Sequence, residues 1–131
     1  MDKILEHFVS TFYELYGSCA EPFLEEEGRR RFLLFIRPII NGTGNYYVEA
    51  ETRDNRRMDL VIDYLGTRHV VEMKIWRGAA YHKNGERQLV DYLNRLNLDN
   101  GSLLTYNFSR DKVPGVSTVV IDGKTITEAM V

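Results

Sequence analysis

The chain has 131 residues and a mass of 15.3 kDa, a length that suits one ordinary domain and leaves no room for a second. It carries 17 basic and 19 acidic side chains, a formal charge of −2, so no overall positive field attracts DNA or an anionic membrane and any nucleic-acid contact has to be local. The apolar share of 44% and the charged share of 27% are typical of a globular protein and exclude a disordered or low-complexity chain.

Cys19 is the single cysteine, so the chain forms no internal disulfide, and no Cys/His cluster has the spacing of a tetrahedral zinc site. The longest apolar run, residues 32–36, is far shorter than a bilayer span. Residues 2–7 carry charge and no signal-peptide pattern precedes them. We therefore expect a reducing, cytoplasmic compartment and no membrane partner.

The first 40 residues predict two helices. Apolar residues recur every three or four positions from Ile4 to Tyr16, which is typical of an amphipathic helix, and Gly17 ends it. A second helix is predicted over residues 23–40, with acidic side chains in its first turn, where they suit the helix dipole. Pro38 interrupts its pattern, and residues 41–45 have the composition of a loop.

From Tyr46 the apolar period changes to two, which predicts strands over residues 46–51, 57–64 and 69–76. A hairpin symmetric about a turn at residues 65–66 places Asp59 opposite Glu72 and Asp63 opposite Arg68. The side chains of this hairpin then divide between two faces. The expected core face carries Met58, Leu60, Ile62, Tyr64, Val71, Met73 and Ile75. The other face carries Asp59, Val61, Asp63, Arg68, Val70, Glu72, Lys74 and Trp76.

The remaining residues predict one more helix and a β-rich end. Residues 77–85 form a polar connection, and leucines at helical spacing indicate a helix over residues 86–97, with Gln88 and Tyr92 on one flank. A fourth strand is predicted over 103–108, followed by a terminal hairpin of residues 116–121 and 124–127. The order is α, α, β, β, β, α, β and then a β appendage, an α/β fold with no linker long enough to divide it.

Asp59, Glu72 and Lys74 carry the chemistry of the polar face. Two carboxylates that face each other across a hairpin, with an amine two residues further along, converge because strand side chains on one face repeat every ~7 Å. Such a group can hold Mg²⁺, which takes oxygen ligands and makes a bound water easier to deprotonate, and Lys74 could orient that water.

The alternative is a solvated face with ordinary cross-strand ion pairs. Three less polar side chains share this face with the carboxylates: Val61, Val70 and Trp76. A mixed face of this kind is expected to be covered, and facing carboxylates that are covered repel each other unless a cation or a proton intervenes. Both interpretations stay open at the level of the sequence.

Three segments resemble the PD-(D/E)XK nuclease superfamily: residues 58–62 (MDLVI), 71–76 (VEMKIW) and 88–92 (QLVDY). That superfamily has an acid on one strand, E-x-K on the next and often Gln on the following helix. More narrowly, residues 38–42 (PIING), 72–78 (EMKIWRG) and 88–93 (QLVDYL) resemble the C-terminal nuclease-like domain that follows an AAA-like ATPase module in many bacterial proteins. The resemblance covers residues 23–128.

The resemblance implies a restriction-endonuclease-like αβββαβ core, with a mixed central sheet flanked by helices. In this chain the core would occupy residues 23–110, preceded by an N-terminal helix in residues 1–22 and followed by a hairpin in residues 111–131, all within one domain.

The resemblance also implies roles for individual residues. Asp59 and Glu72 match the metal ligands, with the Met73 carbonyl as a further oxygen, while Lys74 matches the residue that activates water and Gln88 the helix residue near the site. Met58 replaces the proline of the motif name, which the superfamily tolerates.

A glutamate on the first core helix is also implied, and Glu27 is our choice, with Glu26 next. The triple Glu at this helix start also has a simpler interpretation as solvated charge that suits the helix dipole.

Phosphate contacts are expected from basic side chains near the predicted site. The candidates are Arg56, Arg57, Arg77, His82 and Lys83. Exposed charge that only balances nearby acids, and a solvated histidine in a polar loop, are the alternatives.

The function implied by the resemblance is that of a Mg²⁺- or Mn²⁺-dependent nuclease that hydrolyses DNA, with RNA as the alternative substrate. Cleavage of both strands of a duplex needs two sites, so a homodimer is an open expectation. The competing interpretation is a non-catalytic module of nuclease fold that binds nucleic acid or docks to an ATPase partner.

Overall fold

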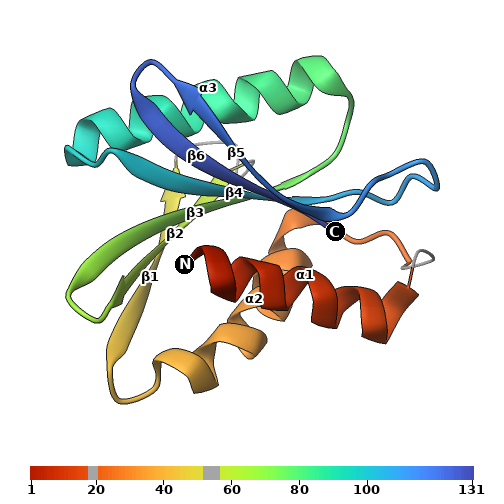
Figure 1. Ribbon diagram of the computed structural model, residues 1–131, viewed down its shortest axis with the longest axis horizontal. Coiled ribbons are helices and arrows are strands. Elements are labelled where there is room, and N and C mark those ends of the chain that lie inside the picture. Colours follow the sequence, from red (N-terminus) through yellow and green to blue (C-terminus); the bar gives the residue numbers. More distant parts are fainter. Residues whose placement is uncertain (18–20, 52–56) are drawn as a thin grey trace.

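The computed structural model describes residues 1–17, 21–51 and 57–131, and gives residues 49–51 and 57–59 by their backbone alone. Within these ranges, three helices and a six-stranded mixed sheet form an α/β fold (Figure 1). The elements in chain order are α1 (Asp2–Tyr16), α2 (Glu25–Ile40), β1 (Gly44–Glu51), β2 (Arg57–Tyr64), β3 (Thr67–Ile75), α3 (Ala79–Leu96), β4 (Asn100–Tyr106), β5 (Gly115–Ile121) and β6 (Lys124–Met130).

The strands lie in the order β1-β2-β3-β4-β6-β5. Strand β2 pairs antiparallel with β1 and with β3, and β4 pairs parallel with β3 and with β6. The edge strand β5 pairs antiparallel with β6. Helix α3 makes the crossover that the parallel pair β3 and β4 requires. The predicted hairpin register is confirmed, since Asp59 pairs with Glu72 and Asp63 with Arg68.

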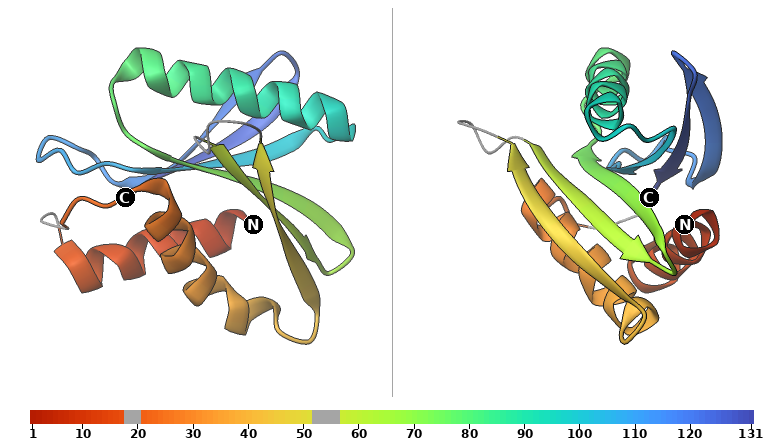
Figure 2. Two further views of the ribbon diagram at one scale, coloured as in Figure 1. Left: turned by 180° about the vertical axis from the view of Figure 1, so that it is seen from behind. Right: turned by 90° about the vertical axis from the view of Figure 1, so that its left-hand side faces the viewer.

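The sheet has a hydrophobic core on each face (Figure 2). Helices α1 and α2 cover one face, with a core that includes Leu5, Phe8, Phe12, Phe32, Ile36, Leu60, Ile62, Val71 and Met73. Helix α3 covers the other face, with a smaller core that includes Val61, Val70, Leu89, Leu93, Leu103 and Ile126. The predicted division of the hairpin between two faces is therefore confirmed for the side chains that are described.

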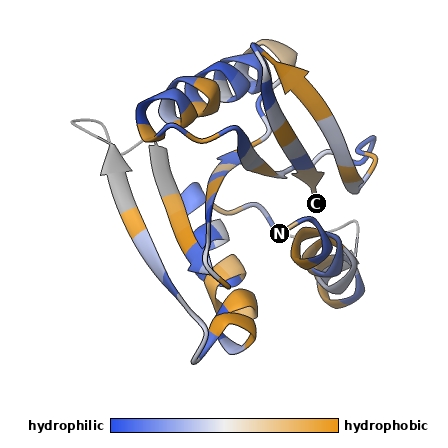
Figure 3. Cartoon of the chain, turned by 60° about the vertical axis from the view of Figure 1, so that its left-hand side comes forward, coloured by the Kyte–Doolittle hydropathy of each residue, from blue (hydrophilic) through white to orange (hydrophobic). Residues whose placement is uncertain are grey.

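Hydrophobic residues are spread over the helices of both layers and the strands between them (Figure 3). None of the helices in the described ranges is both long enough and apolar enough to cross a membrane.

Tyr106, at the end of β4, joins the sheet to the first turns of α2. Its hydroxyl donates a 2.6 Å hydrogen bond to the Gly28 carbonyl, and burial raises the pKa of this hydroxyl well above its usual range, so it remains a donor. A Cβ at Gly28 would overlap the Tyr106 ring, which explains a glycine inside this helix. The contact fixes where α2 begins relative to the ends of the central strands.

Helix α3 begins at Ala79, seven residues before the predicted start at residue 86, so the predicted polar connection over 77–85 is mostly helical. The leucine pattern begins only at Leu89 because the earlier turns of α3 lie over polar side chains of the sheet rather than over its apolar core. Pro38 lies inside the last turn of α2, where its side chain is exposed, and does not end that helix earlier.

The predicted C-terminal hairpin is not an appendage. Strand β6 pairs in parallel with β4 along six positions and extends the central sheet, while β5 forms its edge. Both faces of β6 are covered, because Ile126 packs under α3 and Ala129 packs in the core on the other face. Thr127 and Glu128 lie between these two residues, and their polarity is not typical of an interior strand, so the sequence pattern did not predict this position.

Removal of the Tyr106 hydroxyl tests the link between β4 and α2. The Tyr106→Phe variant should unfold with a free energy about 1 kcal/mol lower than the native chain, because one buried hydrogen bond is lost. Urea denaturation measures the difference. Tyr13→Phe is the control, since Tyr13 is 52% exposed and should change stability little, and equal stabilities of all three chains would contradict the assignment.

Candidate functional site

Glu72 and Lys74 form a buried pair on the α3 side of β3. Glu72 is fully buried and Lys74 is 6% exposed. The Lys74 Nζ lies 3.7 Å from the Glu72 Oε1. Charged side chains are almost never enclosed to this degree unless they are paired. The alternative interpretation of this face as a solvated one therefore does not apply to Glu72 and Lys74.

Helix α3 lies directly over the Lys74 side chain. The Lys74 Nζ is 4.6 Å from the centre of the Tyr81 ring, a cation–π distance. At Gly85, one turn later, a Cβ would lie 2.9 Å from Lys74 Cδ and 3.0 Å from its Cε. The missing side chain at Gly85 therefore lets the helix come down onto the lysine and hold its ammonium group in place.

Gln88 and Tyr92 continue the same stripe of α3, at helical spacings from Gly85. Because α3 runs back along the parallel crossover, this direction leads from Lys74 toward Glu72. Gln88 is exposed, whereas Tyr92 is buried in the smaller core. Tyr92 therefore packs in this core.

Acidic residues occupy adjacent register positions across three strands. Asp59 of β2 pairs with Glu72 of β3 on one side and with Glu49 of β1 on the other. Only the backbones of Asp59 and Glu49 are described, and their side chains lie outside the described residues. Glu49 is a candidate that the sequence interpretation missed, because only the pairing of β1 with β2 brings it into the row.

Met73 and Glu27 belong to the opposite face of the sheet. The Met73 side chain is buried in the core under α1 and α2. Glu27 lies in the first turn of α2, where its carboxylate contacts Arg30 at 3.4 Å and Arg31 at 3.3 Å. Glu26 is also paired with Arg30. These pairs favour the simpler interpretation of the triple Glu as helix-surface charge.

Three of the predicted phosphate-contacting residues, Arg77, His82 and Lys83, have side chains that the structure describes. Arg56 lies outside the described residues, as does the Arg57 side chain. Arg77 is exposed just after β3 and lies 3.9 Å from Glu25, and Lys83 is exposed on α3. His82 is half-buried and faces the sheet.

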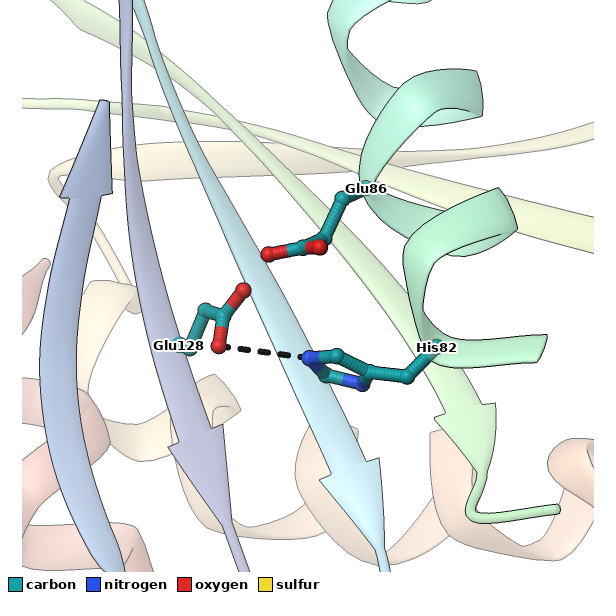
Figure 4. A group of neighbouring side chains, drawn as sticks. All are labelled: His82, Glu86 and Glu128. Carbon is teal, nitrogen blue, oxygen red and sulfur yellow. Dashed lines mark hydrogen bonds and ion pairs between the residues drawn. The ribbon is translucent and has the colours of Figure 1, made fainter. Parts of the chain in front are cut away.

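His82, Glu86 and Glu128 form a group that could hold a metal ion (Figure 4). His82 and Glu86 come from α3 and Glu128 from β6, and the three side chains point toward one another. One ligand atom from each lies within 4.8 Å of the others, and the His82 Nε2 is 3.2 Å from a Glu128 oxygen.

A hydrogen bond with Glu128 is the largest cause that raises the pKa of Glu86, from 4.5 to about 7. Burial and the negative charge of Glu128 raise it further, while Lys83 opposes the shift. Glu86 therefore keeps its proton to a higher pH than an ordinary glutamic acid and donates it to the Glu128 carboxylate.

The sequence analysis placed His82 in a loop and did not name Glu86 or Glu128 as site residues. The four-residue spacing of His82 and Glu86 is a signal for one helix face, but the predicted helix began at Glu86 and left His82 in the polar connection. Glu128 could not be linked to them without the parallel pairing of β6 with β4.

Comparison of the chain with protein-family models finds no match, and comparison with curated proteins finds none either.

The proton on Glu86 makes stability depend on pH. A carboxyl whose pKa is raised by folding stabilises the native state below pH 4.5, and that contribution is lost as the pH rises through about 7. The melting temperature of the native chain relative to Glu86→Gln should therefore fall over this range. Thermal scans in buffers containing a chelator measure it, and a difference that rises or stays constant with pH would contradict a proton held by Glu86.

Proposed function

We propose that this protein is a divalent-metal-dependent nuclease that hydrolyses phosphodiester bonds of DNA in preference to RNA. The observation that carries the proposal is the enclosed Glu72 and Lys74 pair under α3, with Asp59 at the register position beside Glu72. The motif residues of the nuclease superfamily that this chain resembles occupy these positions.

The energetics of burial support a functional role for the pair. Desolvation of each ion costs several kcal/mol, and apolar residues of similar volume often give equal or greater stability than a buried ion pair. Val70 precedes Glu72 on the same face of β3, so apolar packing under α3 is available to this strand. A catalytic role therefore explains a buried acid and amine at this place more readily than a contribution to the stability of the fold does.

The donor set fits a hard cation. Carboxylate oxygens of Asp59 and Glu72, with the Met73 carbonyl, are the ligand types that Mg²⁺ and Mn²⁺ take. When bound, such an ion neutralises charge on the scissile phosphate and lowers the pKa of a water ligand.

The chain's own groups would position the reactants. The Lys74 ammonium, held between Glu72, Tyr81 and the α3 backbone, donates a hydrogen bond to the attacking water and stabilises charge that develops on the phosphate. Gln88 is placed to bind a phosphate or a water at the open flank of α3. Glu27, paired with arginines in the other layer, has no role in this proposal.

The arrangement of elements agrees with the restriction-endonuclease-like core that we propose. The order α2-β1-β2-β3-α3-β4 follows the αβββαβ order of that core, and the antiparallel strands β1 to β3 meet a parallel β4. Helix α1 then adds to the α2 layer, and the β5–β6 hairpin extends the sheet.

Substitution of the proposed ligand and of the lysine tests the nuclease directly. Asp59→Asn and Lys74→Met should each lower the rate of Mg²⁺- or Mn²⁺-dependent DNA cleavage about 100- to 1,000-fold, because each removes a charge that acts on the transition state. Gel assays with labelled single- and double-stranded DNA and with RNA measure the rates.

Asp63→Asn is the matched control. Asp63 lies on the same face of β2 but is paired with Arg68 near the surface, so its loss should leave cleavage unchanged. Cleavage by the Asp59→Asn and Lys74→Met chains at the native rate would contradict the proposal.

Gly85 offers a second test that leaves every proposed catalytic group in place. In Gly85→Ala the new methyl group displaces the Lys74 chain, and a misplacement of about 1 Å can cost about 100-fold in rate. Stability should stay within about 1 kcal/mol of the native value, because alanine favours the helix. Asn84→Ala, an exposed neighbour on α3, should cleave at the native rate, and an equal rate for Gly85→Ala would show that the position of Lys74 is unimportant.

The enclosure of Glu72 favours a second candidate function. A fully buried carboxylate has no surface for a substrate phosphate, as expected for a non-catalytic module of the same fold that binds nucleic acid or docks to an ATPase partner. Binding of DNA that survives chelation, with no product under any divalent cation, would support this candidate over the nuclease.

A further inference from the structure

The group of His82, Glu86 and Glu128 lies apart from the Glu72 and Lys74 pair. Its members bridge α3 and β6, and β4 lies between β6 and the strand that carries the pair. The two groups use different sides of α3, since Tyr81 and Gly85 face Lys74 whereas His82 and Glu86 face Glu128 (Figure 4).

A cleft of about 410 Å³ opens beside this group, and its lining includes His82, Glu128 and Thr105. Thr105 is 1% exposed and its Oγ1 has no hydrogen-bond partner within the described part of the chain. Buried polar atoms normally have partners, so the unpartnered Thr105 hydroxyl at the wall of this cleft indicates a ligand that satisfies it.

We propose that His82, Glu86 and Glu128 form a second divalent metal centre, separate from the proposed nuclease site. One imidazole nitrogen and two carboxylates suit Zn²⁺ or Mn²⁺, whereas Mg²⁺ prefers oxygen ligands alone. Three protein ligands would leave a coordination position for a water or a small anion, which the cleft lined by Thr105 could supply.

The surroundings of the group favour a cation over a simple ion pair. His82 is held against the Trp76 ring, with the ring centres 5.3 Å apart, so its Nε2 stays directed at Glu128. The Glu86 and Glu128 carboxyl groups offer oxygens within 4.8 Å of each other, so two ionised groups repel there and a bound cation would remove that repulsion. Lys83, the basic neighbour on α3, is exposed and lies outside the group.

Calorimetric titration of the full chain with Zn²⁺ and with Mn²⁺ near neutral pH tests the proposal. The native chain should bind one Zn²⁺ or Mn²⁺ at this centre, and the His82→Gln and Glu86→Gln variants should bind it at least about tenfold more weakly. Asp91→Asn, which removes an exposed carboxylate from the same helix, should bind as the native chain does. Melting curves of each chain without metal show that the variants are folded.

The Asp59→Asn variant separates this centre from the proposed nuclease site. It should keep the Zn²⁺ binding that His82→Gln loses, whatever its effect on cleavage. A crystal soaked in Zn²⁺ should give an anomalous peak between His82 and Glu128. Absence of binding by the native chain, equal affinity in His82→Gln and Glu86→Gln, or a peak only elsewhere would overturn the proposal and leave a hydrogen-bonded carboxyl pair.

Discussion

The burial of Glu72 and Lys74 beneath α3 is the constraint on which the rest of this structure depends. Two charged groups without access to bulk water have to be held by defined neighbours, and the chain provides them through the Tyr81 ring, the bare backbone at Gly85 and the mutual contact of 3.7 Å. The helix can come this close only because β3 is followed by a parallel partner, which requires a crossover over this face.

The same crossover places two polar groups of the described residues on one face of the sheet, the Glu72 and Lys74 pair and the group of His82, Glu86 and Glu128. The α1 and α2 face is filled by aromatic and aliphatic side chains, whereas the α3 face combines an apolar core near the end of the helix with two polar groups near its start. Two stripes of α3 therefore cover polar side chains of the sheet, one over β3 and the other over β6.

Much of the fold could be predicted because two patterns are local signals: the alternation of apolar and polar residues in strands, and the recurrence of apolar residues every three or four positions in helices. The hairpin register at Asp59 and Glu72 followed from the turn at residues 65–66, and the face of each strand followed from the register. The early turns of α3 and the interior place of β6 could not be predicted, because both depend on polar residues covered by tertiary contacts. For the same reason Glu128 joined His82 and Glu86 only in three dimensions.

The central claim is that Asp59 and Glu72 hold a divalent cation at the proposed nuclease site. Its most direct test is calorimetric titration with Mn²⁺ in the presence of a short DNA duplex, carried out in a Glu86→Gln background that weakens the second centre. The account predicts one bound Mn²⁺ that is lost when Asp59→Asn is added. Equal Mn²⁺ binding with and without that substitution, or no binding in either chain, would contradict it.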